Sequence, residues 1–130
     1  MPEPTDRTTA PSSEGVPSRF RRVSSRRVRV EDESMLPTLR PGDRLLVDPR
    51  VYRDRLPLAG EIVILIDPRD PDRWLVKRVT AVDPAAATVE VRGDATATAR
   101  DSREFGPVPL RSVVGHAYRI YFPSARRRNL

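Results

Sequence analysis

Residues 61–82 read EIVILIDPRDPDRWLVKRVTAV, and this stretch carries the strongest evidence for the fold. Two runs rich in β-branched and aliphatic residues, 61–67 and 74–82, flank a short segment of Asp, Pro and Arg. Runs of this kind, bounded by turn-forming residues, predict β-strands. Similar short runs occur at 28–30, 43–48, 87–93 and 112–122. No segment shows a sustained helical period, so the chain is predicted to be mainly β, with short strands curled into a barrel or a coiled sheet.

The length of 130 residues predicts a single domain with tails. Residues 1–26 are predicted to form a disordered basic tail, residues 27–122 the folded domain and residues 123–130 a basic C-terminal tail. The net charge of +6 comes mainly from the two ends of the chain, whereas acidic and basic residues are interspersed between them. This distribution is typical of a solvated surface. It predicts no nucleic-acid partner and permits at most a weak contact with an anionic membrane surface.

The absence of cysteine and the presence of one histidine exclude several kinds of chemistry. Disulfides, thiolate nucleophiles and cysteine metal sites are ruled out, and one histidine cannot build a metal centre alone. We therefore predict no metal ion and no organic cofactor, and we assign His116 no catalytic role. Trp74 and Tyr118 are predicted to be core residues.

The longest apolar run, Ile62–Ile66, has five residues, whereas a membrane-spanning helix needs about 20. No signal-peptide core is visible near the N-terminus either. The expectation is therefore a soluble cytoplasmic protein without a transmembrane anchor.

Lys77 is the single lysine among 24 basic residues. In an extended strand it shares a face with Leu75 and Val79, while Trp74 and Val76 point the other way. Apolar neighbours favour the neutral amine and lower its pKa, by as much as 3–5 units for full burial. Arginine cannot lose its proton in this way, so the position suits a general base. The simpler alternative is a lysine whose stem covers the strand while its amine reaches water.

Ser34 follows a predicted strand and begins a tight turn in the segment VEDESMLPTLRPGDRLLVD (30–48). A serine hydroxyl becomes a nucleophile only when a base takes its proton and N–H donors await the oxyanion. Taken alone, Ser34 could equally be a helix N-cap residue. Together with Lys77 it indicates a Ser-Lys dyad, one of the known variants of the Ser-His-Asp triad.

Four segments carry a family resemblance: SMLPTLRPGD (34–43), GEIVIL (60–65), VKRV (76–79) and GDATATARDSREFGPVPLRSVVGHA (93–117). In this order they resemble the type I signal peptidase family of serine proteases, over about residues 28–122. The resemblance implies the coiled β-fold of signal peptidases and of LexA-like proteins, and identifies residues 27–122 as a signal-peptidase-like catalytic domain.

The resemblance also implies roles for individual residues. Ser34 would be the nucleophile, its amide would contribute to the oxyanion hole, Lys77 would be the general base and Met35 would line the catalytic groove. Asp101 and Arg103 would form a structural ion pair near the site. Gly93, Asp94 and Ser102 belong to the same family box.

The chain departs from the family pattern in three respects. The expectation of no transmembrane anchor sets it apart from the family's membrane-bound members, which carry one at the N-terminus, and so it most resembles the short branch of nickel-type superoxide dismutase maturation proteases. That branch would remove an N-terminal leader from a cytosolic precursor. Asp32 stands where the family has glycine or a hydroxyl residue, so its carboxylate must point elsewhere or another group must supply the second oxyanion donor. Ala95 and Ala99 replace an asparagine and a lysine-orienting serine, although Thr98 is one residue away.

Three alternatives remain. A signal peptidase-like enzyme could act on exported preproteins. A LexA-type self-cleaving regulator would use the same dyad, but the first 30 residues contain no credible DNA-binding domain. The altered positions would also suit a catalytically inactive, basic binding module.

Overall fold

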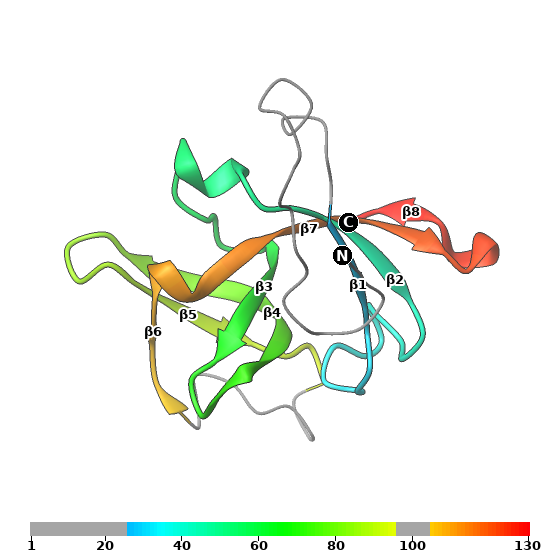
Figure 1. Cartoon of the computed structure of the whole chain (residues 1–130), viewed down its shortest axis with the longest axis horizontal. Helices are drawn as coiled ribbons and strands as arrows, with labels where there is room; N and C mark the ends of the chain where they lie inside the picture. The colour runs from blue at the N-terminus through cyan, green and yellow to red at the C-terminus, as the bar shows by residue number, and fades with distance from the viewer. Residues whose placement is uncertain (1–25, 96–104) are drawn as a thin grey trace.

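The computed structural model describes residues 26–95 and 105–130, which form an antiparallel sheet of short strands (Figure 1). The strands are β1 (Arg26–Arg29), β2 (Arg44–Asp48), β3 (Ile62–Asp67), β4 (Asp70–Asp83), β5 (Thr88–Arg92), β6 (Val108–Pro109), β7 (Val113–Phe122) and β8 (Arg128–Asn129). Their order is β1-β2-β7-β3-β4-β5-β6, with β8 paired to β7. Short 3-10 turns lie at Val51–Arg53 (η1), Leu110–Ser112 (η2) and Ser124–Arg126 (η3). The predicted mainly β fold is therefore confirmed.

β3 and β4 pair in the middle of the sheet (Figure 1), and β3 and the central part of β4, residues 74–79, are buried on both faces. Alternate residues of β4 enter different apolar clusters, as the period of a strand requires. Leu75 and Val79 pack in one cluster, whereas Trp74 and Val76 pack in the other. The predicted alternation along this strand is confirmed, and the sheet must coil to cover both faces.

Register shifts allow the sheet to coil. They interrupt the pairing of β7 with β2 and with β3, and the pairing of β4 with β5. Each shift bends a strand and increases its local twist. Gly115 lies at a close crossing of β7 and the end of β2, because a Cβ there would lie 2.6 Å from the carbonyl oxygen of Asp48. A side chain at this position would push the two strands apart.

Residues 123–130, for which the sequence predicts a basic tail, lie against the sheet. η3 and β8 follow β7, and β8 pairs with Arg119 and Ile120. Arg126 donates two hydrogen bonds to the carboxylate of Asp43, at 2.8 and 2.9 Å. Asp43 is 1% exposed, and although burial raises its pKa, the hydrogen bonds from Arg126 and from the Arg40 amide lower it below the ordinary value. The buried carboxylate is therefore paired with a residue near the end of the chain.

Arg126→Ala is expected to lower the free energy of unfolding by about 3 kcal/mol, because it leaves a buried carboxylate without its cation. Arg127→Ala is the matched control, since Arg127 is the exposed next residue. Urea unfolding at pH 7 measures both variants. Equal stability of the two would show that the Arg126–Asp43 pair does not hold this end of the chain.

Several predicted features lie outside the described residues. They are the tail up to residue 25 and the positions Thr98, Ala99, Asp101, Ser102 and Arg103. Among the residues that are described, no helix has the length and apolar composition that crossing a membrane requires.

Candidate active site

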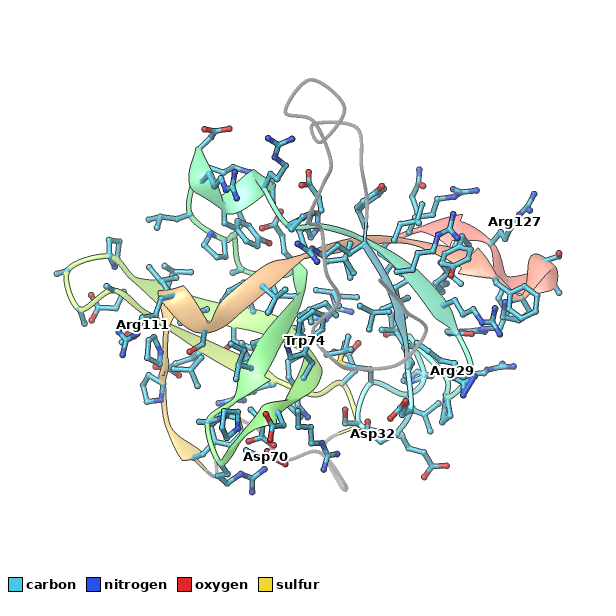
Figure 2. The ribbon with its side chains drawn as sticks, viewed as in Figure 1. Arg29, Asp32, Asp70, Trp74, Arg111 and Arg127 are labelled. Atoms are coloured by element: carbon cyan, nitrogen blue, oxygen red, sulfur yellow. The ribbon has the colours of Figure 1, made fainter. Side chains whose placement is uncertain are left out.

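Ser34 and Lys77 line the same pocket, which has a volume of about 500 Å³. Its wall consists of Asp32, Glu33, Ser34, Asp67, Arg69, Arg73, Leu75 and Lys77. The pocket thus joins the turn after β1 to the first half of β4 and the end of β3. Figure 2 shows Asp32 beside the β3–β4 hairpin, on the same side of the molecule as Asp70.

The Ser34 turn is held by backbone hydrogen bonds. The Leu36 amide donates to the Glu33 carbonyl at 3.2 Å, and the Leu39 amide donates to the Met35 carbonyl at 2.9 Å. The Ser34 carbonyl accepts a hydrogen bond from the Ala95 amide at 2.9 Å. Ser34 is 9% exposed and lines the pocket wall. The turn that carries it is bonded to Ala95, in the segment after β5.

Lys77 lies within the apolar core of the sheet. It is 2% exposed, and its pairing partner on β3 is Val63, which is fully buried. Leu75 and Val79, its neighbours on the same face, pack in the same cluster as Val63. An amine in such surroundings is removed from water, a condition that favours its neutral form.

A second pocket of about 450 Å³ adjoins the first and shares Asp32, Ser34, Arg73 and Leu75 with it. Its apolar lining comes from Val30, Met35, Trp74 and Val76. Together the pockets form a groove with Ser34 in both halves, Lys77 in one half and Met35 in the other.

The groove runs beside stretches of backbone that could pair with an added strand. The ladder between β4 and β5 begins at Arg78, so residues 73–77 of β4 precede it. Residues 31–32 lie just beyond β1, the first strand in the sheet order, and follow Val30, whose own amide and carbonyl are bonded to Asp43 and Gly42. Both stretches contribute to the second pocket. An extended peptide can bind in such a place by adding its backbone to a strand edge.

Asp32 points toward the nucleophile turn. Its Oδ1 accepts a hydrogen bond from the Ser34 amide at 3.0 Å, and its Oδ2 lies 3.7 Å from Arg73 Nη2. From the sequence, this carboxylate is expected to point away from the site, or the second oxyanion donor to come from another group. The structure instead places it on the Ser34 amide, because an aspartate side chain readily bonds to the backbone two residues on.

Asp94 joins the Ser34 turn to β4. It accepts hydrogen bonds from Arg78 at 2.9 and 2.8 Å and from the Thr38 hydroxyl at 2.5 Å. Arg78 follows Lys77, and Thr38 belongs to the turn that begins at Ser34. The Arg78 guanidinium lowers the pKa of the Asp94 carboxyl below its ordinary value. The carboxylate therefore braces the turn against β4.

Asp94→Asn is expected to lower the free energy of unfolding by about 2 kcal/mol at pH 7, since it weakens hydrogen bonds to a charged partner. The pKa of Asp94 is lower in the folded protein than in the unfolded chain, where it is about 3.9. The ionised carboxylate therefore stabilises the fold at pH values above about 3.9, and this contribution is lost as the pH falls through the pKa of the folded state. The difference between wild type and Asp94→Asn should therefore shrink below about pH 4. Urea unfolding from pH 7 to pH 3 measures it. Glu90→Gln, on the exposed side of β5, is the control, and a pH-independent difference would contradict the prediction.

The remaining predicted residues are placed as follows. Gly93 is buried at the end of β5, next to Asp94. Trp74 is buried in the core, as predicted, and Tyr118 is half-buried on β7. His116 lies 3.8 Å from Glu61, outside both pockets, and burial lowers its pKa.

Sequence reasoning assigned no role to Arg73, Thr38, Arg78 or Arg126. Thr38 lies in the segment SMLPT and Arg78 in VKRV, both of which carry the family resemblance, so the sequence marks both residues as candidates. Arg73 and Arg126 stand in charged segments with no such signal. Across residues 26–95 and 105–130, no group of three or more Asp, Glu or His side chains is placed to hold a metal ion.

Comparison with known proteins agrees with this architecture. The family model described as signal peptidase, peptidase S26, matches residues 19–90. The chain is 35% identical to mitochondrial ATP-independent inner membrane protease subunit 1b of Arabidopsis thaliana, over 63% of this chain and 61% of that protein. It is 32% identical to mitochondrial inner membrane protease subunit 2 of Mus musculus, over 78% and 70% of the two chains. It is 25% identical to a probable signal peptidase I-1 of Synechocystis sp., over 75% and 71%.

The family match covers more than half of the chain, and it includes both Ser34 and Lys77. The chain spans about three fifths of the length of the Arabidopsis relative and about 70% of the mouse relative. This chain therefore belongs to the signal peptidase family, peptidase S26, a family of serine peptidases.

Proposed function

We propose that the protein is an endopeptidase that removes an N-terminal leader from a precursor protein, using Ser34 and Lys77 as a catalytic dyad. The observation that carries the proposal is their shared pocket, in which Lys77 is 2% exposed. Removal of the amine from water favours the neutral base that the reaction needs, whereas the acidic side chains of the same pocket favour the charged form. Membership of the signal peptidase family supports proteolysis of a leader in general.

In the proposed reaction an extended peptide lies in the groove, with its backbone along residues 73–77. The Ser34 Oγ attacks the scissile carbonyl carbon while Lys77 Nζ accepts its proton. The protonated amine then passes that proton to the leaving amino group, which gives an ester between Ser34 and the leader segment. A water molecule, deprotonated by the same amine, hydrolyses the ester and restores Ser34.

We propose a cytoplasmic precursor of nickel-type superoxide dismutase as the substrate. The proposal rests on the resemblance of this chain to the short branch of the family. The leader would bind in extended form, and its side chains would enter the half of the groove lined by Val30, Met35 and Val76. No metal ion or organic cofactor takes part in the proposed reaction.

A second candidate function is removal of signal peptides from exported preproteins. The observation that favours it is the similarity to the Synechocystis protein, whose name is probable signal peptidase I-1. The two candidates use the same dyad and differ in substrate.

The test is to incubate the purified protein with a leader-bearing dismutase precursor and, separately, with a secretory preprotein. Mass spectrometry then reads any new N-terminus. A single new N-terminus on the dismutase precursor supports the first candidate, and cleavage of the secretory preprotein alone supports the second. If neither is cleaved and no serine reagent acylates Ser34, both candidates are wrong. Nucleic-acid binding without an adduct on Ser34 would then support the binding module.

A further inference from the structure

The Ser34 amide, which the proposed reaction needs as an oxyanion donor, already has an acceptor. Asp32 Oδ1 accepts its hydrogen bond at 3.0 Å. A backbone amide carries one proton, so it cannot serve Asp32 and a developing oxyanion fully at the same time. An oxyanion hole works only when its donors lie within hydrogen-bond distance of the reacting oxygen. The Asp32 carboxylate therefore takes the hydrogen bond that the oxygen of the scissile carbonyl would need.

The charge of Asp32 makes the competition stronger. A carboxylate oxygen accepts hydrogen bonds more strongly than a neutral oxygen does. A carboxylate that remained in place would also repel the negative charge that forms on the substrate carbonyl. Both effects slow acylation and leave the resting groove intact.

Asp32 has a second partner at hand. Arg73 Nη2 lies 3.7 Å from Asp32 Oδ2. The Arg73 side chain is 57% exposed and the Asp32 side chain is 52% exposed. Both residues line both pockets, together with Ser34. A half-exposed carboxylate can rotate away from the amide at modest cost, and a rotation toward Arg73 would shorten a contact that is long in the resting state.

We propose that Asp32 is a positioning residue that blocks the Ser34 amide in the resting enzyme and must turn toward Arg73 before acylation. The inference rests on the proposed function, since it concerns the acylation of Ser34. It predicts an enzyme whose acylation rate is limited by its own carboxylate and is increased by removing it.

The opposite role is also physically reasonable, and it predicts the opposite sign. An aspartate bonded to the amide two residues on can stabilise a turn. If Asp32 served to hold the Ser34 turn, its removal would slow acylation, and asparagine would replace it well. If Asp32 blocks the amide, the order of rates is Asp32→Ser, then Asp32→Asn, then wild type. Serine cannot present a carboxylate, whereas asparagine still offers a neutral oxygen. Because a serine hydroxyl could itself donate to the oxyanion, Asp32→Ala, which offers neither a carboxylate nor a donor, must also be faster than the wild type.

The experiment measures acylation of the full chain by an acetylated tripeptide 4-nitrophenyl ester. Release of nitrophenolate gives the rate, and intact-protein mass identifies the ester on Ser34. Asp32→Ser is expected to raise kcat about tenfold with little change in KM. The variant no longer has to break the hydrogen bond from the Ser34 amide to a charged carboxylate before acylation, and a tenfold change matches the strength of one such bond. Glu90→Ser is the control, because Glu90 is exposed on β5 and lies outside both pockets.

Arg73→Ala gives a second readout. In the wild type it is expected to lower kcat about threefold, because Asp32 loses the partner toward which it turns. In the Asp32→Ser background the decrease is expected to be smaller, since the two residues act through one contact. If Arg73→Ala lowers kcat by the same factor in both backgrounds, Arg73 is not the residue toward which Asp32 turns.

The outcomes separate the inference from the proposed function. Acylation of the wild type on Ser34, with Asp32→Ser equal or slower, overturns the inference and leaves the dyad intact. Acylation that is detectable only in the Asp32 variants supports both. If neither the wild type nor any Asp32 variant is acylated, the dyad itself is wrong and the inference fails with it.

Discussion

Ser34→Ala is expected to abolish leader removal, with a loss in kcat on the order of 10⁴-fold or more. Removal of a serine nucleophile leaves only binding and oxyanion stabilisation, which supply a small part of the rate. The change deletes one hydroxyl from a residue that is 9% exposed, and the backbone bonds of the turn stay in place. Cleavage of the precursor, followed by mass spectrometry over several hours, measures the loss.

The fold of Ser34→Ala must be shown to be intact for this result to count. Its urea unfolding curve is expected to match that of the wild type within about 0.5 kcal/mol, as for a substitution that makes no cavity. Ser112→Ala, in η2 and outside both pockets, is the matched serine control and is expected to cleave normally. Full activity in Ser34→Ala would show that another group is the nucleophile.

Lys77→Met is expected to remove activity to a comparable extent, because methionine has a similar length and shape but no basic nitrogen. Lys77 lies beside Val63, Leu75 and Val79 in the sheet, and a urea unfolding curve shows whether the methionine variant keeps the fold. Lys77→Arg is expected to be equally inactive and less stable, since the guanidinium is larger and stays charged. Normal cleavage by either variant would contradict the role of Lys77 as the base.

Lys77 can also be observed directly, because it is the single lysine of the chain. Protein labelled with ¹³C-lysine gives one side-chain signal to follow during a pH titration. The proposal requires this signal to titrate below the ordinary lysine value of about 10.4. It also requires the acylation rate to rise with pH through the same midpoint. A midpoint at or above the ordinary value would exclude a neutral amine at working pH.

The strands follow from local patterns in the sequence, and this is why they could be predicted. Period-two alternation and flanking turn residues indicate β4 whatever the rest of the chain does. The same alternation correctly separated Leu75 and Val79 from Trp74 and Val76. The turn at residues 40–43 is equally local: Pro41 and Gly42 suit its two central positions, and Gly42 has a φ of +95°.

Other features depended on contacts between distant residues. Thr38 and Asp94 are separated by 56 positions, and Asp43 and Arg126 by 83. No local period reports such pairs. The basic end of the chain reads as a tail in composition, yet it is joined to a buried carboxylate. β6 and β8 have two residues each and are too short to leave a pattern.

By itself, the sequence determined which segments are extended, which side chains share a face and which hydroxyl and amine are candidates for catalysis. These properties depend on the geometry of a few neighbouring residues. Tertiary structure alone decided that Ser34 and Lys77 line one pocket and that Asp94 joins their segments. The reason is that these relations depend on how far the sheet coils, which is set by packing across the whole domain.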